Sequence, residues 1–450
     1  MNYYIETYGC QMNEYDSLIT ESLLDQSKAV KVALPEEADL ILINTCSVRE
    51  NAHQKIFNRL QSIAHLQKKG AKIGILGCMA QSLGDDLLDK NLPLNFVVGP
   101  DSLRTLVKTM ESEADLKEKS IHIKLSKTET YEDIIPTIDH HQGIKKDILS
   151  AHVAIQRGCD KFCSFCIVPF TRGRERSRAP ESVIKEINLL VENGIKSIVL
   201  LGQNVNSYHH ENTSFTALVQ MILEQTLLER IYYTSPHPKD FPLELIKLTA
   251  ENERVGTQIH IPLQSGSDRM LEKMKREYTS AEFLQLVKKF RSSIENLSIS
   301  TDVIVGFCGE SDEDYQQTLD VMEEAQFDSA YMFAYSPRPH TYAWNHYSDD
   351  ITPEVKSQRL QKLIDLQHQR ALAINEAYRG KSFEVMIETI SRKDSHSLQS
   401  VMRNGKKVIV PVAENIPVVM DRLLGKRFVV EITGATSHSL RGTGSIDHLT

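Results

Sequence analysis

Three cysteines close together in the middle of the chain carry the clearest chemical signal. They lie in the segment Cys159-Asp-Lys-Phe-Cys163-Ser-Phe-Cys166. Protein thiolates hold iron–sulfur clusters, usually four at a time, so a compact group of three leaves one iron of a four-iron cluster without a protein ligand. Structural zinc and buried free thiols are the alternatives, but zinc favours paired short spacings or matching histidines, which this segment lacks. The spacing therefore predicts a cluster with one iron open to a substrate or cosubstrate.

Three further cysteines, Cys10, Cys46 and Cys78, each follow a stretch that we expect to form a strand. Those stretches span residues 3–8, 38–44 and 72–77. Amphipathic segments of helix length separate them, which is typical of a parallel sheet covered by helices. Because parallel strands end at one edge of a sheet, we expect the three thiols to lie together there. Burial as three small core residues is the alternative, but each stands beside a turn-forming or polar residue, which favours a second cluster with an open iron.

The rest of the chain predicts two more units. Strand and helix stretches alternate six times before residue 378, with strands expected at 151–156, 197–201, 230–234, 258–262, 297–305 and 330–335. This repetition predicts a partial (β/α)6 barrel whose chemistry lies at the carboxyl ends of its strands, where the central cysteine loop also falls. Short alternating strands, expected at 383–389, 407–411 and 427–432, then predict a small all-β module. The expected parts of this α/β protein are a parallel αβα domain at 1–115, a connector at 116–144, the barrel at 145–378 and the all-β module at 379–446.

Composition limits the setting in which the protein works. Its 41% hydrophobic and 25% charged residues are ordinary for a globular protein. No apolar run approaches the roughly 20 residues of a membrane span, and the start lacks the pattern of a secretory signal. We expect a cytoplasmic protein without membrane contact, in which seven cysteines serve metal or catalytic roles rather than disulfides. The net charge is −8, yet residues 379–446 carry 11 Lys/Arg against six Asp/Glu, which favours a polyanionic partner.

The Cys-x-x-x-Cys-x-x-Cys spacing, with Phe165 before its last cysteine, resembles the radical S-adenosylmethionine superfamily. The resemblance implies that the open iron binds the amino and carboxylate groups of S-adenosylmethionine, and that the reduced cluster cleaves it to a 5′-deoxyadenosyl radical. It also implies that loops after the second, fourth and fifth barrel strands hold this cosubstrate. Taken alone, each loop is a common glycine turn. The residues expected to contact the cosubstrate are Phe165, Gly202, Gln203, Asn204, Gln264, Ser265 and Gly306.

The whole chain resembles the methylthiotransferase family, which combines an amino-terminal cluster domain, a radical S-adenosylmethionine core and a carboxyl-terminal TRAM domain. Three motifs resemble its branch that acts on N6-dimethylallyladenosine next to the anticodon of tRNA. They are Thr7-Tyr-Gly-Cys-Gln-Met-Asn-Glu-Tyr-Asp-Ser17, Asn44-Thr-Cys-Ser-Val-Arg-Glu50 and Leu201-Gly-Gln-Asn-Val-Asn206. The resemblance implies that the C2 hydrogen of the adenine is replaced by a methylthio group. Side-chain bases are poorly suited to that step because the C2–H is not acidic enough.

The same resemblance implies the cofactors and partners. Two 4Fe-4S clusters are expected, with one S-adenosylmethionine methylating a sulfur held on the amino-terminal cluster and a second supplying the radical. Besides tRNA, we expect an electron donor such as flavodoxin or ferredoxin and a sulfur donor, with the enzyme acting as a monomer. Four arginines within residues 172–178 could bind a carboxylate or phosphate, although such a run is usually a solvated face. The expected tRNA contacts are Arg174, Arg176, Arg392, Lys393, Lys406 and Lys407.

Two other functions stay open at this point. A sibling methylthiotransferase would act on threonylcarbamoyladenosine in tRNA or on a ribosomal protein. A non-catalytic iron–sulfur protein would bind tRNA without cleaving S-adenosylmethionine. The chain also departs from the family pattern at Cys308, where proline is usual, and at Glu277, where glycine is usual. Neither position is an expected cluster ligand, and we expect Cys308 to be a buried core residue.

Overall fold

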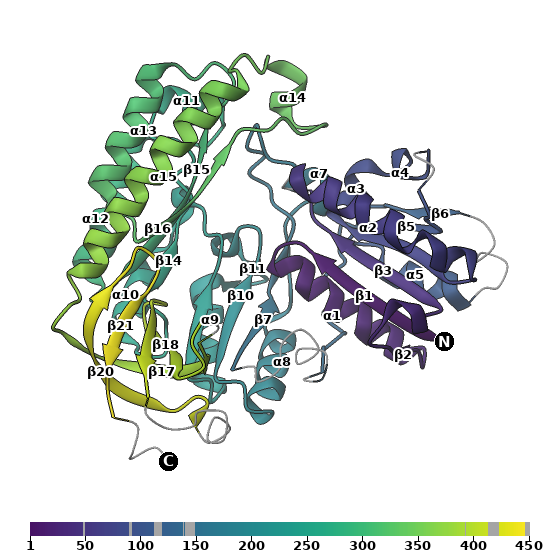
Figure 1. Cartoon of the computed structure of the whole chain (residues 1–450), viewed down its shortest axis with the longest axis horizontal. Coiled ribbons are helices and arrows are strands. Elements are labelled where there is room, and N and C mark those ends of the chain that lie inside the picture. The colour runs from purple at the N-terminus through teal and green to yellow at the C-terminus, as the bar shows by residue number, and fades with distance from the viewer. Residues whose placement is uncertain are drawn as a thin grey trace.

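The computed structural model of the chain describes residues 1–47, 50–89, 92–111, 119–137, 139, 149–391, 393–412 and 423–445. Three units follow one another along the chain (Figure 1). The amino-terminal unit lies on one side of the central unit, and the carboxyl-terminal unit lies across one end of it (Figure 1). Within the described part of the chain, every helix is too short or too polar to cross a lipid bilayer.

The amino-terminal unit is a six-stranded parallel sheet covered by helices on both faces. Its strands are β1 Asn2–Tyr8, β2 Val30–Lys31, β3 Leu40–Thr45, β4 Lys72–Gly77, β5 Phe96–Val98 and β6 Ser120–His122, in the order β2-β1-β3-β4-β5-β6. Its helices are α1 Gln11–Gln26, α2 Glu50–Lys68, α3 Cys78–Leu83, α4 Asp86–Asp89 and α5 Leu103–Glu111. Alternate residues of β3 pack into two separate apolar layers, as expected for a strand buried on both faces. Because β6 pairs with β5, the sheet continues into the stretch expected to be a connector.

The central unit contains the six expected barrel strands. They are β7 Ser150–Ala154, β10 Ser197–Leu201, β13 Arg230–Tyr233, β14 Gln258–His260, β15 Ser298–Val305 and β16 Ser329–Ala334. They form two parallel sheets, β13-β10-β7 and β14-β15-β16, which a bridge between Ile231 and Val255 joins. The outer helices are α8 Pro180–Glu192, α9 Phe215–Gln225, α10 Leu243–Glu251, α12 Ser280–Ser293, α13 Asp312–Ala325 and α15 Pro353–Glu376. The prediction of a six-stranded partial barrel is confirmed.

Shorter elements of the central unit shape its loops. They are β8 Gln156–Arg157, α7 Val168–Arg172, β9 Arg176–Ser177, β11 His209–His210, β12 Thr213–Ser214, α11 Asp268–Lys273 and α14 Tyr342–His346. The sequence pattern did not predict them, because pieces of two to six residues carry too little periodicity. The pairing of β8 with β9 closes the long loop that carries the central cysteines.

The carboxyl-terminal unit is a closed barrel in the order β17-β18-β19-β21-β20. Its strands are β17 Ser382–Ile390, β18 Ser397–Met402, β19 Lys407–Pro411, β20 Arg427–Ala435 and β21 Leu440–Thr443. The all-β prediction is confirmed, although β18 and β21 were missed because serine, glutamine and glycine interrupt their apolar pattern. Arg403 fixes this barrel to the core by donating to the backbone carbonyls of Thr249, Asn252 and Val255. The barrel therefore sits at the amino ends of the core strands.

Buried arginines of the core hold the amino-terminal unit in place. Arg172 bonds to Asp16 at 2.8 Å, and Arg176 bonds to Asp101 through both of its terminal nitrogens at 2.6 and 3.1 Å. Arg178 pairs with Glu186 of the core, and both of these side chains also bond to the hydroxyl of Tyr15 in α1. The arginine run does bind carboxylates, but they belong to this chain. Arg174 alone points outward, where it pairs with Asp160.

Arg176 and Arg174 offer a matched test of this interface. We expect Arg176→Met to lower the free energy of unfolding by about 3–5 kcal/mol, because it leaves Asp101 buried and unpaired. Arg174→Met should change it little, because the Arg174 side chain is 69% exposed whereas that of Arg176 is 4% exposed. Urea denaturation of both variants measures the difference. Equal losses from the two substitutions would contradict a stabilising role for the buried pair.

Candidate active site

The three amino-terminal cysteines follow the ends of three neighbouring strands, and these strand ends lie in register with one another. In the pairing of β1 with β3, Tyr8 lies opposite Thr45, and in the pairing of β3 with β4, Thr45 lies opposite Gly77. Cys46 directly follows Thr45 and Cys78 directly follows Gly77. Cys10 lies two residues after the end of β1. Cys46 and Cys78 are buried and Cys10 is exposed. The expected gathering of thiols at one sheet edge is therefore present.

Two buried asparagines shape that edge. Asn13 donates to the side-chain oxygen of Asn44 at 3.1 Å and to the carbonyl of Thr45 at 3.0 Å, and Asn44 donates back to the carbonyl of Asn13 at 2.8 Å. These amides fill the space beside Gly77, where an added Cβ would lie 2.4 Å from Asn44 Oδ1. The Cys10 thiol donates to Asn13 Oδ1 at 3.3 Å. The loop conformation that positions the thiols thus depends on this amide pair.

A buried guanidinium stands beside these thiols. A hydrogen bond to Cys46 lowers the pKa of Cys10 to about 6, and the positive charge of Arg172 lowers it as well. Burial raises the pKa of Cys78, and Arg172 acts in the opposite direction through its charge and a hydrogen bond. Thiolates are the form that binds metal ions. The core thus provides a cation next to the cysteines of the other unit.

The central cysteines lie on the loop that β8 and β9 enclose. The amide of Cys159 donates to the carbonyl of Gly173 at 3.1 Å, and the amide of Cys166 donates to the carbonyl of Cys163 at 3.0 Å. Arg276 Nη1 donates to the sulfur of Cys163 at 3.2 Å. Burial raises the pKa of Cys159 to about 11 and that of Cys166 to about 12. Such thiols ionise when a metal replaces their protons.

The thiols of each set are close enough to act on one another electrostatically: Cys163 acts on Cys159 and Cys166, and Cys10 acts on Cys78. Across the described residues, no three His, Cys, Asp or Glu side chains are close enough to share one metal ion. Zinc requires its ligands within one coordination sphere. A four-iron cluster places each thiolate on a different iron, and three thiolates leave one iron open. The donor chemistry of both sets therefore suits such a cluster.

The loops expected to hold the cosubstrate lie at the carboxyl ends of β10, β14 and β15. Gln203 accepts from the amide of Gly158, next to Cys159, at 2.5 Å. Asn204 is buried, and its side-chain oxygen has no hydrogen-bond partner among the described residues. That oxygen could accept an N–H or O–H from a bound molecule. The second barrel loop is thus tied to the cysteine loop and keeps one acceptor available.

The other two loops adopt constrained conformations. Gln264 has a φ of 66° and Gly306 a φ of 69°, and the amide of Gly306 donates to Glu310 at 2.7 Å. Ser265 is buried, and its hydroxyl bonds to Thr318 in α13 at 3.3 Å. Left-handed backbone at a non-glycine residue often marks a functional site. The tight turns hold these loops at the carboxyl end of the barrel.

Phe165 and Cys308 belong to one apolar cluster behind the cysteine loop. The ring of Phe165 packs edge-on against Phe307 at 6.5 Å between centroids. Cys308 is 1% exposed and packs with Met270 and Met274. The expectation that Cys308 is a buried core residue is confirmed.

A cavity of about 450 Å³ occupies the interior of the partial barrel, and all three units line it. Gln11, the neighbour of Cys10, comes from the amino-terminal unit, and Glu388 and Lys407 come from the carboxyl-terminal barrel. Inward-facing side chains of the core strands form the remaining wall. They include Tyr232, His260, Ser300, Asp302, Tyr331 and Phe333. One cavity therefore extends from the neighbour of Cys10 to the all-β module.

The wall of this cavity is unusually polar and aromatic for the inside of a barrel. His260 bonds to Ser300 at 3.0 Å and to Asp302 at 3.1 Å, and its ring packs edge-on against Tyr331. Tyr331 is 57% exposed and Phe333 is 36% exposed. Exposed aromatic faces suit stacking against a planar ligand. Sequence reasoning missed these residues, although serine and aspartate at alternate positions of the apolar strand β15 were a usable signal.

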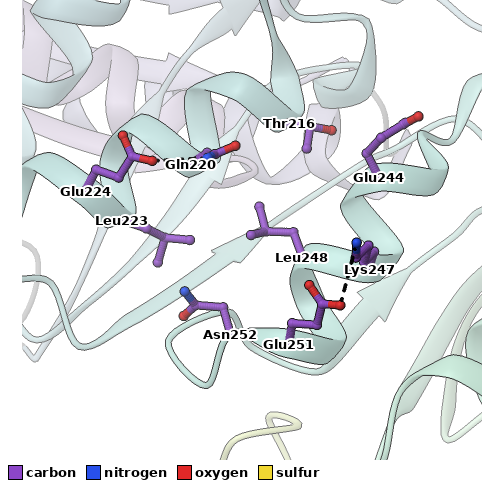
Figure 2. A pocket seen from close by; sticks show the side chains of 9 residues that line it. All are labelled: Thr216, Gln220, Leu223, Glu224, Glu244, Lys247, Leu248, Glu251 and Asn252. Carbon is purple, nitrogen blue, oxygen red and sulfur yellow. Dashed lines mark hydrogen bonds and ion pairs between the residues drawn. The ribbon is translucent and has the colours of Figure 1, made fainter.

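A second cavity, of about 420 Å³, lies between α9 and α10 on the outside of the barrel. Figure 2 shows its lining, which includes Glu224, Glu244 and an ion pair between Lys247 and Glu251. These helices cover the strands from outside, so the groove lies away from the cysteine loops. It supplies no chemistry to the site.

The expected tRNA contacts fall into three groups. Arg174, Lys393 and Lys407 are accessible, and Lys407 lines the barrel cavity. Arg392 lies outside the described residues. Arg176 is buried, and the side chain of Lys406 is 9% exposed and bonds to Asp328 at 2.6 Å and to Asn375 at 2.7 Å. Because ion pairs within this chain already engage these two side chains, the structure offers no support for a tRNA contact at either position, and the expected role stays a prediction.

Comparison with known proteins identifies the family. Residues 2–99 match the Uncharacterized protein family UPF0004, and residues 153–322 match the Radical SAM superfamily. The tRNA-2-methylthio-N(6)-dimethylallyladenosine synthase of Phocaeicola vulgatus is 40% identical over 98% of this chain and 95% of its own length. The protein of that name in Porphyromonas gingivalis is 43% identical over 90% of this chain and 88% of its own length. The chain belongs to the tRNA-2-methylthio-N(6)-dimethylallyladenosine synthase family.

Solved structures agree on the fold of this family member. The radical S-adenosylmethionine methyltransferase TsrM from Kitasatospora setae matches with a TM-score of 0.54 and 12% identity, covering 76% of this chain and 77% of its own. The cobalamin-dependent radical enzyme OxsB matches with a TM-score of 0.52 and 13% identity, covering 81% of this chain and 56% of its own. At these identities the likeness is one of fold alone.

Gly158 and Gly194 allow a matched test of the cysteine loop. Both have positive φ, so alanine costs about 1–2 kcal/mol at either position. A Cβ at Gly158 would lie 2.0 Å from the carbonyl oxygen of Arg174, whereas one at Gly194 would meet nothing within 4 Å. We expect Gly158→Ala to open the loop and to lower iron binding at the central cysteines, with Gly194→Ala unaffected. Iron analysis after anaerobic reconstitution measures this, and equal iron in both variants would contradict it.

Proposed function

We propose that this protein converts N6-dimethylallyladenosine in tRNA, next to the anticodon on its 3′ side, into its 2-methylthio derivative. The curated relatives carry the name of that synthase over nearly the whole chain. The observation that carries the proposal is the barrel cavity, which places the neighbour of Cys10, the core strands and the all-β module around one space. An RNA loop that entered from the all-β side would reach the cysteine sets through it.

The residues present fit two 4Fe-4S clusters. Cys159, Cys163 and Cys166 would hold the central one, and Cys10, Cys46 and Cys78 would hold the amino-terminal one. When bound, the clusters and S-adenosylmethionine supply a methylated sulfur and a radical able to break the C2–H bond homolytically. The protein's part is to bind and orient the reactants and to exclude water.

Six of the seven expected cosubstrate residues have a task in this proposal. Asn204 would accept a hydrogen bond from S-adenosylmethionine through its buried side-chain oxygen. Gln203 would keep the cysteine loop in register by holding the amide of Gly158. Gln264, Ser265 and Gly306 would present backbone groups at the barrel rim. Phe165 would support the loop from its apolar side.

The barrel wall would hold the base that is modified. Proteins read single-stranded RNA by turning out unstacked bases and stacking them on aromatic rings. Tyr331 and Phe333 offer such rings, and the side chains of His260 and Asp302 offer polar groups for a base edge. Lys407 borders this pocket, whereas Lys393 and Arg174 lie outside it. These side chains would contact phosphates of the RNA backbone.

The remaining partners follow from the chemistry. Radical formation requires a one-electron donor, such as flavodoxin or ferredoxin, and repeated turnover requires a sulfur donor. We propose that the protein acts as a monomer in the cytoplasm, where its tRNA substrate is found. The names of the relatives favour this substrate over threonylcarbamoyladenosine or a ribosomal protein.

An anaerobic reaction of the reconstituted protein tests the function. It contains S-adenosylmethionine, a reductant, sulfide and tRNA bearing dimethylallyladenosine, and nucleoside mass spectrometry detects the product. We expect the 2-methylthio nucleoside from the native protein and from Cys308→Ala, whose thiol lies outside both sets. Cys159→Ala should abolish 5′-deoxyadenosine and product, and Cys10→Ala should abolish the product. Formation of 5′-deoxyadenosine without any methylthio nucleoside would refute the choice of substrate.

Tyr331 tests the barrel wall as the base site. Base–aromatic stacking contributes about 1–3 kcal/mol, so Tyr331→Ala should raise KM for tRNA by about tenfold or more. Tyr331→Phe keeps the ring and should behave like the native protein. The rate of S-adenosylmethionine cleavage without tRNA serves as the control and should stay the same in both variants. An unchanged KM in Tyr331→Ala would place the base elsewhere.

A further inference from the structure

Arg172 has an incomplete set of partners although it is buried. It ends the short helix α7, just after the cysteine loop, and its side chain is 4% exposed. Nη2 donates to Asp16 of the amino-terminal unit at 2.8 Å. Nη1 makes no hydrogen bond to an oxygen or nitrogen atom within the described part of the chain, and Arg172 is also hydrogen-bonded to the thiol of Cys78. A thiol sulfur is a weak acceptor, so this buried charged donor stays poorly satisfied and can donate to an anionic group bound beside it.

The thiols of the amino-terminal unit are the neighbours of this guanidinium. Its charge acts on Cys10 and Cys78. Helix α7 packs against α3, which Cys78 begins (Figure 1). Arg172 thus stands on the core and reaches the thiols across the boundary between two units.

Asp16 holds the guanidinium in this position. One of its oxygens accepts from Arg172, and the other lies 2.8 Å from Arg157 Nη2. Asp16 and Arg157 are both buried. Because two arginines share this carboxylate, the local charge stays net positive. The excess charge faces thiols that would themselves be negative when they hold a cluster.

We propose that Arg172 binds the anionic sulfur ligand, sulfide or methanethiolate, at the open iron of the cluster on Cys10, Cys46 and Cys78. This inference rests on the proposed function. A fourth anionic sulfur beside three thiolates is repelled by their charge. Arg172 offsets that repulsion by donating an N–H from Nη1, and charge-assisted hydrogen bonds are among the strong ones in proteins. The planar guanidinium can bond to Asp16 and to the sulfur at once, which a lysine cannot do with the same geometry.

The assignment also explains why the two units must dock. The cysteines belong to one unit and the donor to the other, so the sulfur site is complete only in the assembled protein. Asp16 and Arg157 act as positioning residues, because they contact Arg172 rather than the sulfur.

The test uses the full chain with Cys159, Cys163 and Cys166 changed to alanine, so that only the amino-terminal cluster remains. Into this background we introduce Arg172→Gln, Arg172→Lys or, as the control, Arg174→Gln. Iron and sulfide analysis reports cluster content, and an electron paramagnetic resonance titration of the reduced cluster reports the Kd of methanethiolate. We expect equal iron in all four proteins. We also expect Kd to rise about tenfold to a hundredfold in Arg172→Gln, less in Arg172→Lys, and not at all in Arg174→Gln.

Three results would overturn the inference in distinguishable ways. An unchanged Kd in Arg172→Gln, with iron retained, would show that Arg172 does not bind the sulfur. Loss of iron from both Arg172 variants, with Arg174→Gln intact, would make Arg172 a residue that only supports the fold. If Arg172→Gln alone fails to fold, Arg172→Lys serves as the test variant. A native Kd for methanethiolate in Arg172→Lys would then show that the two-pronged geometry of the guanidinium is not needed to bind the sulfur. Absence of iron from the background protein would refute the proposed function itself.

Discussion

The need of buried arginines for acceptors determines how the amino-terminal unit sits on the core. Arg157, Arg172 and Arg176 come from the core and find Asp16 and Asp101 on the other unit. Buried ion pairs contribute little net stability compared with apolar packing, but breaking one leaves an unpaired charge at a cost of about 3–5 kcal/mol. Any other docking of the two units would strand several charges at once. These buried ion pairs therefore specify a single arrangement of the two units. That arrangement sets the positions of the two cysteine groups relative to one another.

Much of this architecture could be predicted from local patterns. Strands such as β4 and β10 are short apolar runs flanked by amphipathic helices, and both were predicted with the bounds that the structure shows. Because the cysteines follow strands of a parallel sheet, strand order alone was enough to bring Cys10, Cys46 and Cys78 together. The prediction that these three cysteines meet thus rested on the pairing of backbone strands and needed no knowledge of side-chain packing. The family resemblance supplied the chemistry, since spacing by itself does not name a substrate.

The arginine run shows where local reasoning fails. Arg172 and Arg176 have acceptors 156 and 75 residues earlier in the chain, and no feature of the segment 172–178 reports on them. Lys406 and Lys407 show the same limit at shorter range. Lys406 precedes β19 and points toward Asp328 of the core, whereas Lys407 begins the strand and borders the cavity. Which of two adjacent lysines is buried depends on the partner surface, so composition could predict a basic module but not its contacts.

The reaction space must be closed to water, and the protein alone does not close it. A radical that abstracts hydrogen attacks other bonds within reach unless water and competing groups are excluded. The aromatic rings of Tyr331 and Phe333 remain partly exposed, so solvent reaches the wall of the cavity. In the proposed function, the bound RNA loop covers the opening of the cavity and its base covers the rings. A seated substrate then leaves the C2–H as the bond within reach of the radical, and the docking of three units around one cavity lets a single RNA loop provide that protection.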